Sequence, residues 1–189
     1  MYSIKVYDPV ADKIEIGAVI KEMALLANEP KRHPVLAETG LYVFWGATVY
    51  VYFDEDDVPL SMNCTKFGKR KKNVWEPYGN WYGAYTLPAH RRMGYAYRLY
   101  AEVERDLVKA GCRRIKSLAG SSAGLGLHRA LRHQCWGLTA ENEVFVDSVL
   151  PGHEGKYTGL TPPQAPGNLM TSKEVDFFIK KGLRYDHGK

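Results

Sequence analysis

The sequence predicts an α+β fold, with one domain over residues 1–150 and an extension over residues 151–189. With 189 residues, of which 45% are hydrophobic, the chain can bury one sizeable core. Alternating or β-branched segments and helix-periodic segments follow one another in the order β-α-β-β-β-α-β-α-β. After residue 150 the composition changes, because "PGHEGKYTGLTPPQAPGN" contains four prolines and four glycines.

The first half of the chain predicts one helix and four strands. "YSIKVYD" alternates as a short strand, and apolar residues near helical spacing then predict a helix from Asp12 until Pro30 stops it. We expect "KRHPVLAETG" to lie in a loop. Two strands are predicted within residues 47–68, around the acidic turn "FDEDDVP", and "NWYGAYTL" predicts the next. These strands are expected to form an antiparallel meander.

The second half alternates helices and strands. Apolar residues on one face predict a helix from Gly94 to Ala110, and Gly111 ends it. "CRRIKSLAG" predicts a buried strand, and Ser121 or Ser122 can cap a helix that runs through "AGLGLHRALRHQ". "ENEVFVDSVL" predicts the last strand of the domain, and "SKEVDFFIKKGL" a short helix in the extension.

Charge and cysteine content predict a soluble, cytoplasmic protein without a metal. No run of 18 apolar residues and no signal-peptide pattern is present, so we expect no membrane association. The three cysteines lack metal-ligand spacing and are expected to be reduced. The net charge of +5 favours anionic partners. The basic run "KFGKRKK", from Lys66 to Lys72, is either a solvated hairpin loop or a contact patch.

The stretch "PAHRRMGYA", which begins at Pro88, breaks the local rules for the start of a helix. Cationic side chains in a first turn oppose the helix dipole, and Gly costs about 1 kcal/mol relative to Ala in a helix. Such a start is tolerated when backbone amides face an anion across a closely approaching glycine turn. The stretch therefore predicts a phosphate site at a strand-to-helix junction.

This stretch, in this element order, resembles the GCN5-related N-acetyltransferase (GNAT) family. The family signature is Arg or Gln, two residues, Gly, one residue, and Gly or Ala, which Arg91, Gly94 and Ala96 match. Pro88 also stands three residues before Arg91, as it often does in the family. The resemblance covers roughly residues 1–150 and implies an α/β three-layer fold: a mixed, mostly antiparallel sheet with helices on both faces.

The resemblance implies acetyl-CoA as co-substrate. Main-chain N–H groups at the helix start would bind its pyrophosphate, and Arg91 and Arg92 would add charge. Strand backbone near the end of "NWYGAYTL" would pair with the pantetheine amides. The residues implied in coenzyme binding are Thr86, Leu87, Arg91, Arg92, Met93, Gly94, Tyr95 and Ala96.

The catalytic residues depart from the family pattern. Where family members often carry a Tyr four residues before a Gly, this chain has His133 before Gly137, and an imidazolium could protonate the departing thiolate. The family's Asn at the start of the helix after "CRRIKSLAG" is replaced by the Ser121–Ser122 region. The proton of the attacking amine would go to a carboxylate, directly or through water, and Glu76 is the first candidate, with Glu143 and Asp147 as alternatives.

The sequence thus predicts an acetyl-CoA-dependent N-acetyltransferase acting on a primary amine. A macromolecular acceptor, a protein or a nucleic-acid-associated one, is favoured, because small polycations need several converging carboxylates. The alternative is a non-catalytic module of the same fold that contacts an anionic partner such as nucleic acid through the basic run. A nucleotide-binding protein suggested by "GSSAGLG" has the wrong glycine spacing. A homodimer is left open.

Overall fold

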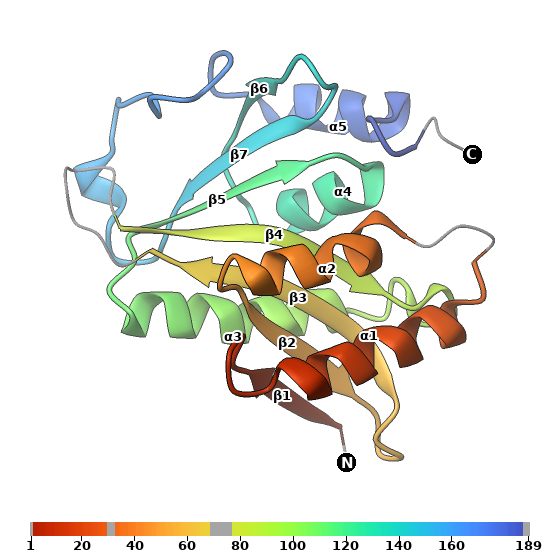
Figure 1. Cartoon of the computed structure of the whole chain (residues 1–189). Coiled ribbons are helices and arrows are strands. Elements are labelled where there is room, and N and C mark those ends of the chain that lie inside the picture. Colours follow the sequence, from red (N-terminus) through yellow and green to blue (C-terminus); the bar gives the residue numbers. More distant parts are fainter. Residues whose placement is uncertain (1, 30–32, 69–76, 187–189) are drawn as a thin grey trace. The chain divides into compact units, whose positions relative to one another are not determined.

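The computed structural model describes residues 2–29, 33–68 and 77–186 (Figure 1). The chain divides into two compact units, one made of Met1–Phe67 and Trp81–Asp106 and the other of Gly68–Asn80 and Leu107–Lys189. Two elements, β4 (Tyr78–Thr86) and α3 (Tyr95–Lys109), contribute residues to both units. The division into a domain over residues 1–150 and an extension stays a prediction.

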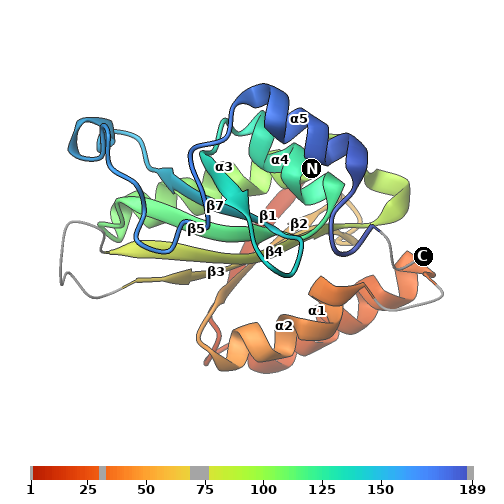
Figure 2. The same ribbon diagram turned by 90° about the horizontal axis from the view of Figure 1, so that it is seen from above.

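The first unit is a mostly antiparallel part of the sheet with helices on both of its faces. Its strands follow the order β1-β2-β3-β4. Tyr50 of β2 faces Val6 of β1 and Asn63 of β3, in antiparallel register. Figure 2 shows α1 and α2 on one face of these strands and α3 on the other. Besides β4 and α3, its elements are β1 (Ser3–Tyr7), α1 (Lys13–Ala27), α2 (Pro34–Phe44), β2 (Thr48–Phe53) and β3 (Pro59–Phe67).

Helix α2 was not predicted, and the expected loop over "KRHPVLAETG" is wrong for the described residues from His33 onward. The helix begins with Pro34 in its first turn, and the Nδ1 atom of His33 accepts a hydrogen bond from the Val35 N–H at 3.3 Å. Its sequence, with Gly40 in the middle and β-branched or aromatic residues after it, has low helix propensity. Burial of Leu36, Tyr42 and Val43 compensates, because packing overrides propensity.

The second unit packs two helices on one side of three strands. Strand β5 (Arg114–Ala119) pairs antiparallel with β7 (Val144–Val149), and β7 pairs antiparallel with β6 (Cys135–Leu138). Helices α4 (Ser122–Ala130) and α5 (Ser172–Lys181) enclose a core with these strands. That core includes Ala119, Leu125, Cys135, Val144, Val146, Val175 and Leu183.

Strand β6 is the second element that the sequence analysis missed. The helix predicted to run to Gln134 ends at Ala130, and the chain turns at Arg132, whose φ is +58°. A left-handed residue without glycine gives no recognisable stop signal. The strand is only four residues long, and the Met170 N–H donates to its Cys135 carbonyl at 2.8 Å.

Within the described residues the chain has seven strands and five α-helices. The β1–β2, β2–β3, β5–β7 and β6–β7 pairings are antiparallel, and the chain is mixed α/β, so the predicted fold class is confirmed. All three cysteines are unpaired and buried, as predicted, and burial raises the pKa of the Cys64 thiol to about 12. None of the described helices has the length and apolar character needed to cross a membrane.

A buried ion pair joins β5 to β7 in the second unit. Arg114 and Asp147 pair directly, and their side chains are 1% and 0% exposed. The Arg114 guanidinium also lies 5.4 Å from the centre of the Tyr157 ring. Burial raises the pKa of Asp147 to about 6, although the charge of Arg114 opposes this rise. The pair anchors the start of β5 to the end of β7.

We expect Arg114→Met to lower the free energy of unfolding by about 3–5 kcal/mol, because it leaves the buried Asp147 carboxylate without a counter-charge. The matched control is Arg129→Met, which breaks the exposed Arg129–Asp176 pair and should cost no more than about 1 kcal/mol. Urea unfolding of both variants measures the difference. Equal losses would contradict the role assigned to the buried pair.

Candidate functional site

The signature stretch forms a sharp turn between β4 and α3. A single turn of 3-10 helix at Pro88–His90 leads to Arg91, which is extended, and α3 begins at Tyr95. Arg92 and Gly94 both have positive φ, +67° and +82°. Gly is therefore required at position 94 for its backbone conformation, and the non-glycine Arg92 carries strain. Strain of this kind concentrates at functional sites.

The start of α3 offers backbone N–H groups to an anion. The Arg98 N–H donates to the Gly94 carbonyl at 3.0 Å, so the amides of Tyr95, Ala96 and Tyr97 precede the first intrahelical bond. A Cβ added at Gly94 would meet no atom within 4 Å. The space beside this turn is open, and the helix dipole makes it favourable for negative charge.

Tyr95 packs the turn against β2. Its ring is 8% exposed and packs against Tyr52, at a centroid distance of 4.8 Å, and against His90 at 6.2 Å. One turn further along α3, the Arg98 guanidinium donates to the Tyr52 hydroxyl at 3.1 Å. These contacts fix the helix start to β2, so the amides are presented by a rigid element.

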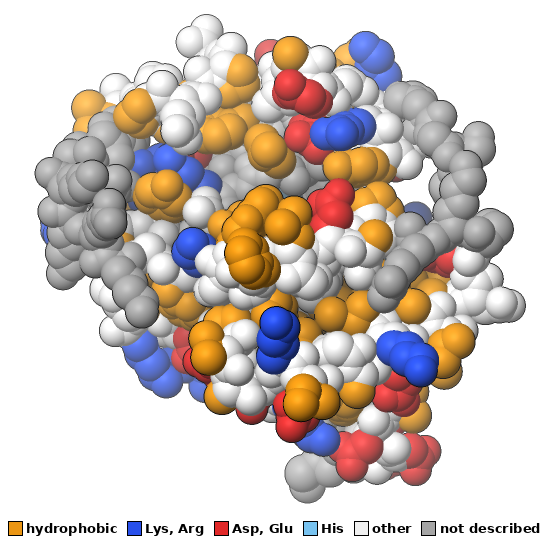
Figure 3. Space-filling view, viewed as in Figure 1, with side chains coloured by type: hydrophobic (Ala, Val, Ile, Leu, Met, Phe, Trp, Pro, Cys, Tyr) orange, Lys and Arg blue, Asp and Glu red, His pale blue; other side chains and the backbone are white. Residues whose placement is uncertain are grey.

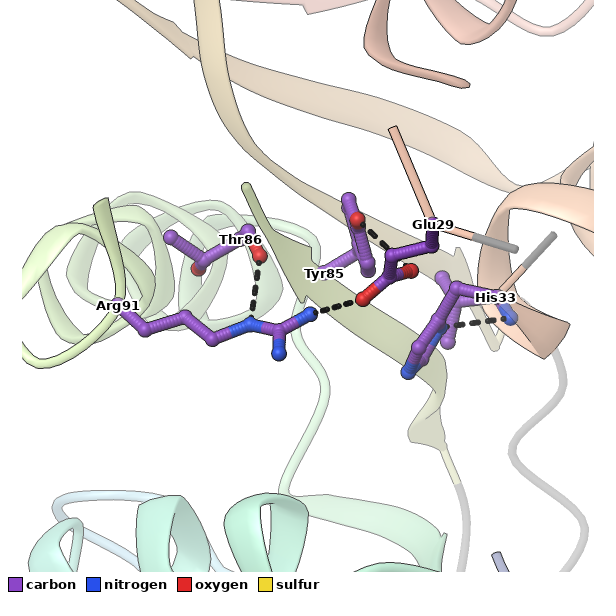
Figure 4. A network of polar contacts seen from close by, with 6 residues as sticks. Glu29, His33, Tyr85, Thr86 and Arg91 are labelled. Carbon is purple, nitrogen blue, oxygen red and sulfur yellow. Dashed lines mark hydrogen bonds and ion pairs between the residues drawn. The ribbon is translucent and has the colours of Figure 1, made fainter. Parts of the chain in front are cut away.

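Arg91 connects the turn to the end of α1 (Figure 4). Its Nη2 atom lies 2.8 Å from Glu29 Oε1, and its Nε donates to the Thr86 carbonyl at 3.2 Å. Tyr85 donates its hydroxyl to Glu29 Oε2 at 3.2 Å. Both oxygens of the Glu29 carboxylate are therefore held, one by the signature arginine and one by β4.

Protonation states in this network are set by burial. Burial raises the pKa of Tyr85 to about 12, so the phenol keeps its proton and donates it to Glu29. Burial lowers the pKa of His33, so its imidazole is neutral at pH 7. His33 accepts at Nδ1 and packs on the Tyr85 ring at a centroid distance of 4.7 Å. Its remaining proton is therefore on Nε2.

A cavity of about 270 Å³ lies beside this network in the first unit. Glu29 and His33 supply its acceptor and donor groups, and side chains of α1 and α2 supply its apolar wall. The lining residues are Lys21, Ala24, Leu25, Ala27, Glu29, His33 and Leu36. A carboxylate in a mostly apolar cavity suits a ligand with an amine and an apolar stem.

Thr86 and Leu87, predicted to pair with pantetheine, already make internal hydrogen bonds. The Thr86 carbonyl accepts from Arg91, and its hydroxyl lies 2.8 Å from the Ser61 hydroxyl. The Leu87 N–H donates to the Leu60 carbonyl at 3.0 Å, and its own carbonyl accepts from the His90 N–H.

The start of α4, where the family Asn is replaced, is capped from within the second unit. Ser121 accepts from the Gly124 N–H, and the backbone N–H and hydroxyl of Ser122 both donate to Asp186 Oδ2, at 2.8 and 2.6 Å. Nearby, the Tyr185 N–H donates to the Gly120 carbonyl. The segment after α5 therefore supplies the anion at this helix start.

His133 lies in a part-buried pair of histidines. Its Nδ1 atom lies 2.8 Å from Nδ1 of His128, and burial lowers the pKa of His133 to about 4. A group with this pKa is neutral at pH 7, so the imidazolium expected at that position is absent there. A role for His133 in proton donation stays a prediction.

We expect His133→Ala to lower kcat no more than about tenfold, since a neutral imidazole is a weak acid, whereas loss of a general acid costs about 10²–10⁴-fold. Steady-state kinetics at pH 7, with acetyl-CoA affinity measured separately, provide the test. A hundredfold loss of kcat at unchanged affinity would restore His133 as the acid.

The predicted carboxylates have other partners or lie outside the described residues. Glu76 and the basic residues 69–72 fall outside them, and Lys66 is half-buried in β3. Glu143 pairs with Arg184 at 3.4 Å, and Asp147 pairs with Arg114. Glu29, Tyr85 and His33 were not predicted, because their convergence depends on how α1, β4 and the start of α2 are placed, and the sequence analysis expected a loop at α2.

Residues 21–134, more than half of the 189 residues, match the acetyltransferase (GNAT) family model. The chain belongs to this family. The predicted resemblance and the predicted class of enzyme, an N-acetyltransferase, are thereby confirmed. No curated protein matches the chain.

Solved structures share the fold. Naa20 of Chaetomium thermophilum, in complex with a bisubstrate analogue, is 12% identical with a TM-score of 0.60, covering 88% of this chain and 95% of that one. The structure of yncA from Salmonella typhimurium with its cofactor acetyl-CoA is 15% identical with a TM-score of 0.53, and the match covers 86% of this chain and 99% of that one. A chain of the NatC complex bound to Gag peptide and CoA is 13% identical with a TM-score of 0.53, and the match covers 79% of this chain and 98% of that one. Identities this low carry the fold alone.

Proposed function

We propose that this protein transfers the acetyl group of acetyl-CoA to a primary amine. The observation that carries the proposal is the turn before α3, where open backbone amides lie beside Gly94 and Arg91 ties the turn to the Glu29 carboxylate. Family membership supports the reaction. The acetyl-CoA in the yncA structure and the CoA in the NatC structure support the co-substrate.

The coenzyme would be held mainly by the helix start. The amides from Arg92 to Ala96 would bind the pyrophosphate, and the exposed Arg92 would add positive charge to it. Arg91, which the sequence analysis also directed to the phosphates, contacts Glu29 and Thr86, and its role at the phosphates stays a prediction. We assign Arg91 the task of positioning Glu29 beside the turn.

The reaction requires an unprotonated amine. An amine with a pKa of about 10.4 is mostly charged at pH 7, which costs roughly 4–5 kcal/mol of reactivity. Glu29, held by Tyr85 and Arg91, would take the amine proton, directly or through water. The amine nitrogen then forms a bond to the thioester carbonyl carbon, the carbon–sulfur bond breaks, and the CoA thiolate leaves and takes up a proton.

The acceptor that we favour is a macromolecule, a protein or one associated with nucleic acid. The net charge of +5 favours acidic surfaces over small polycations. In the first unit the amine cavity contains one carboxylate, Glu29, among the described residues, together with Lys21. This is a poor lining for a polyamine or aminoglycoside. The Gag peptide in the NatC structure supports a protein acceptor. The runner-up function is a non-catalytic module that binds an anionic partner.

The test is an acceptor screen by mass shift. Acetyl-CoA is supplied with peptides of varied N-termini, lysine-containing peptides, spermidine and an aminoglycoside, over a salt series. We expect acetylation of peptides that weakens as salt rises, because screening reduces charge steering. Efficient acetylation of spermidine, at a rate that does not change with salt concentration, would contradict the proposal of a macromolecular acceptor. Absence of any acetylated product, together with salt-dependent retention on a polyanion column, would favour the binding module.

A further inference from the structure

In the second unit, the extension that follows β7 borders a cavity of about 650 Å³. One wall is formed by β6 and the end of β7, and it includes Gln134, Trp136 and Ser148. The other wall is formed by residues within the range 154–161 of the extension, together with Leu169. Figure 1 shows the extension, in blue, as an arc between β7 and α5. None of the described residues that line this cavity lines the amine cavity of the first unit, so the two are separate.

Specific contacts hold the extension against β6. The Met170 N–H donates to the Cys135 carbonyl at 2.8 Å. Gly137 of β6 has φ of +108°, and a Cβ added there would meet the Cα atom of Gly167 at 3.2 Å. Glycine at position 137 therefore lets the returning chain cross β6 closely. Tyr157, nearer to β7 along the extension, is buried. The wall formed by the extension is thus a packed part of the second unit.

Much of the cavity lining is aromatic or aliphatic. Trp136 of β6 and Tyr157 of the extension are both buried, and the Trp136 indole N–H donates to the Asp147 carbonyl at 2.9 Å. The indole ring therefore offers a ligand its apolar surface. Leu160 and Leu169 also line the cavity, although they are exposed. Figure 3 shows apolar side chains at the surface over the extension, at the upper left. A lining of this kind suits a ligand with an apolar body.

Three polar side chains of the same cavity are free to bind a ligand. Arg132, Gln134 and Ser148 have no side-chain hydrogen bond or ion pair with any of the described residues. Ser148 is only 5% exposed, and a buried hydroxyl without a partner is destabilising. A guanidinium, an amide NH2 group and a hydroxyl can all donate to an anion. The three side chains therefore predict an acceptor group on the ligand.

The charges of the lining select a singly charged anion. Among the described residues that line the cavity, Arg132 is the one cation and Glu154 the one carboxylate. Glu154 Oε1 accepts a hydrogen bond from the Gly152 N–H at 3.2 Å. One arginine beside a carboxylate is a poor match for a doubly charged phosphate. A carboxylate ligand carries one negative charge, and arginine binds it with two parallel hydrogen bonds.

We propose that this cavity binds an organic monocarboxylate with an aromatic or branched apolar body. Arg132, Gln134 and Ser148 donate to its carboxylate, and its body packs on the rings of Trp136 and Tyr157. The same chemistry occurs in a free aromatic acid and in the C-terminal residue of a peptide. Binding at this cavity requires neither acetyl-CoA nor the signature turn, so the proposal is independent of the acetyl transfer proposed above.

Nuclear magnetic resonance of the ¹⁵N-labelled full chain, without acetyl-CoA, tests the proposal. The probes are 3-phenylpropionate and a peptide that ends in phenylalanine, each also as the uncharged amide, up to about 10 mM. We expect the acids to shift the indole N–H signal of Trp136, which Trp136→Phe identifies, and the amides to bind at least about tenfold more weakly. Tighter binding of the peptide acid would identify a peptide C-terminus as the source, and tighter binding of 3-phenylpropionate a small molecule. No shift with either acid, or equal affinity of acids and amides, overturns the proposal.

Substitutions then test which side chains hold the carboxylate. Arg132→Gln should weaken binding of the acids at least about tenfold and leave the weak binding of the amides unchanged. Ser148→Ala should weaken it about threefold or more without lowering the unfolding temperature, because it removes a hydroxyl that has no partner among the described residues. The matched control Lys156→Gln removes one charge from an exposed residue of the extension that does not line the cavity, and should change affinity less than about twofold. Unchanged affinity for the acids in Arg132→Gln overturns the proposal.

Discussion

Gly94→Glu is expected to abolish acetyl-CoA binding, with at least a hundredfold increase in Kd. Gly94 has φ of +82°, a backbone conformation that is unfavourable for residues with a side chain. A Cβ added there would point into the open space beside the α3 amides. A carboxylate there would occupy the position of the pyrophosphate, and its negative charge would repel the phosphates of the coenzyme. Isothermal titration calorimetry with acetyl-CoA measures the change.

The chain offers a closely matched control for this substitution. Gly152 has φ of +83°, and a Cβ there would also meet no atom within 4 Å. Gly152→Glu therefore introduces the same strain and charge away from the signature turn. Its acetyl-CoA affinity should equal that of the wild type. Unchanged affinity in Gly94→Glu would remove the turn from the coenzyme site.

Glu29→Gln is expected to lower kcat by about 10²–10⁴-fold while acetyl-CoA affinity changes little. Glutamine keeps one oxygen, which accepts from the Arg91 guanidinium, and its NH2 group donates to the Tyr85 hydroxyl oxygen once that hydroxyl turns, so both contacts to the side chain are kept. It removes the carboxylate that takes the amine proton.

Comparing the effects on kcat and on the Kd of acetyl-CoA separates a catalytic role of Glu29 from a structural one. If Glu29 only positions Arg91, its substitution should raise the Kd of acetyl-CoA and leave kcat nearly unchanged. Glu22→Gln, at an exposed carboxylate on α1, controls for lost charge and should leave both quantities unchanged. A kcat of Glu29→Gln within a few-fold of the wild type would exclude Glu29 as the proton acceptor.

The fold was predictable where one local signal was strong. The helix from Tyr95 has a clear apolar face, with Leu99, Val103 and Leu107 buried, and β2 is a run of β-branched and aromatic residues. The signature turn was predictable because Gly94 and its basic neighbours break the rules for a helix start. Such breaks are expected at functional sites.

The remaining site was not predictable because it depends on long-range packing. Glu29 and Tyr85 are separated by 56 residues along the chain, and their hydrogen bond needs α1 and β4 to be placed first. Helix α2 has weak local propensity, so no local pattern indicated that His33 lies beside Tyr85. The burial of His133 beside His128 is likewise a tertiary effect, which the local sequence does not show.

The function proposed for this chain is the transfer of an acetyl group from acetyl-CoA to an amine. Incubation with isotopically labelled acetyl-CoA and a peptide mixture, read by mass spectrometry together with thiol release, tests it most directly. We expect labelled N-acetyl peptide and free CoA in equal amounts, both lost in Gly94→Glu and retained in Gly152→Glu. Acetyl-CoA that binds to the wild type without forming labelled peptide or free thiol would contradict it.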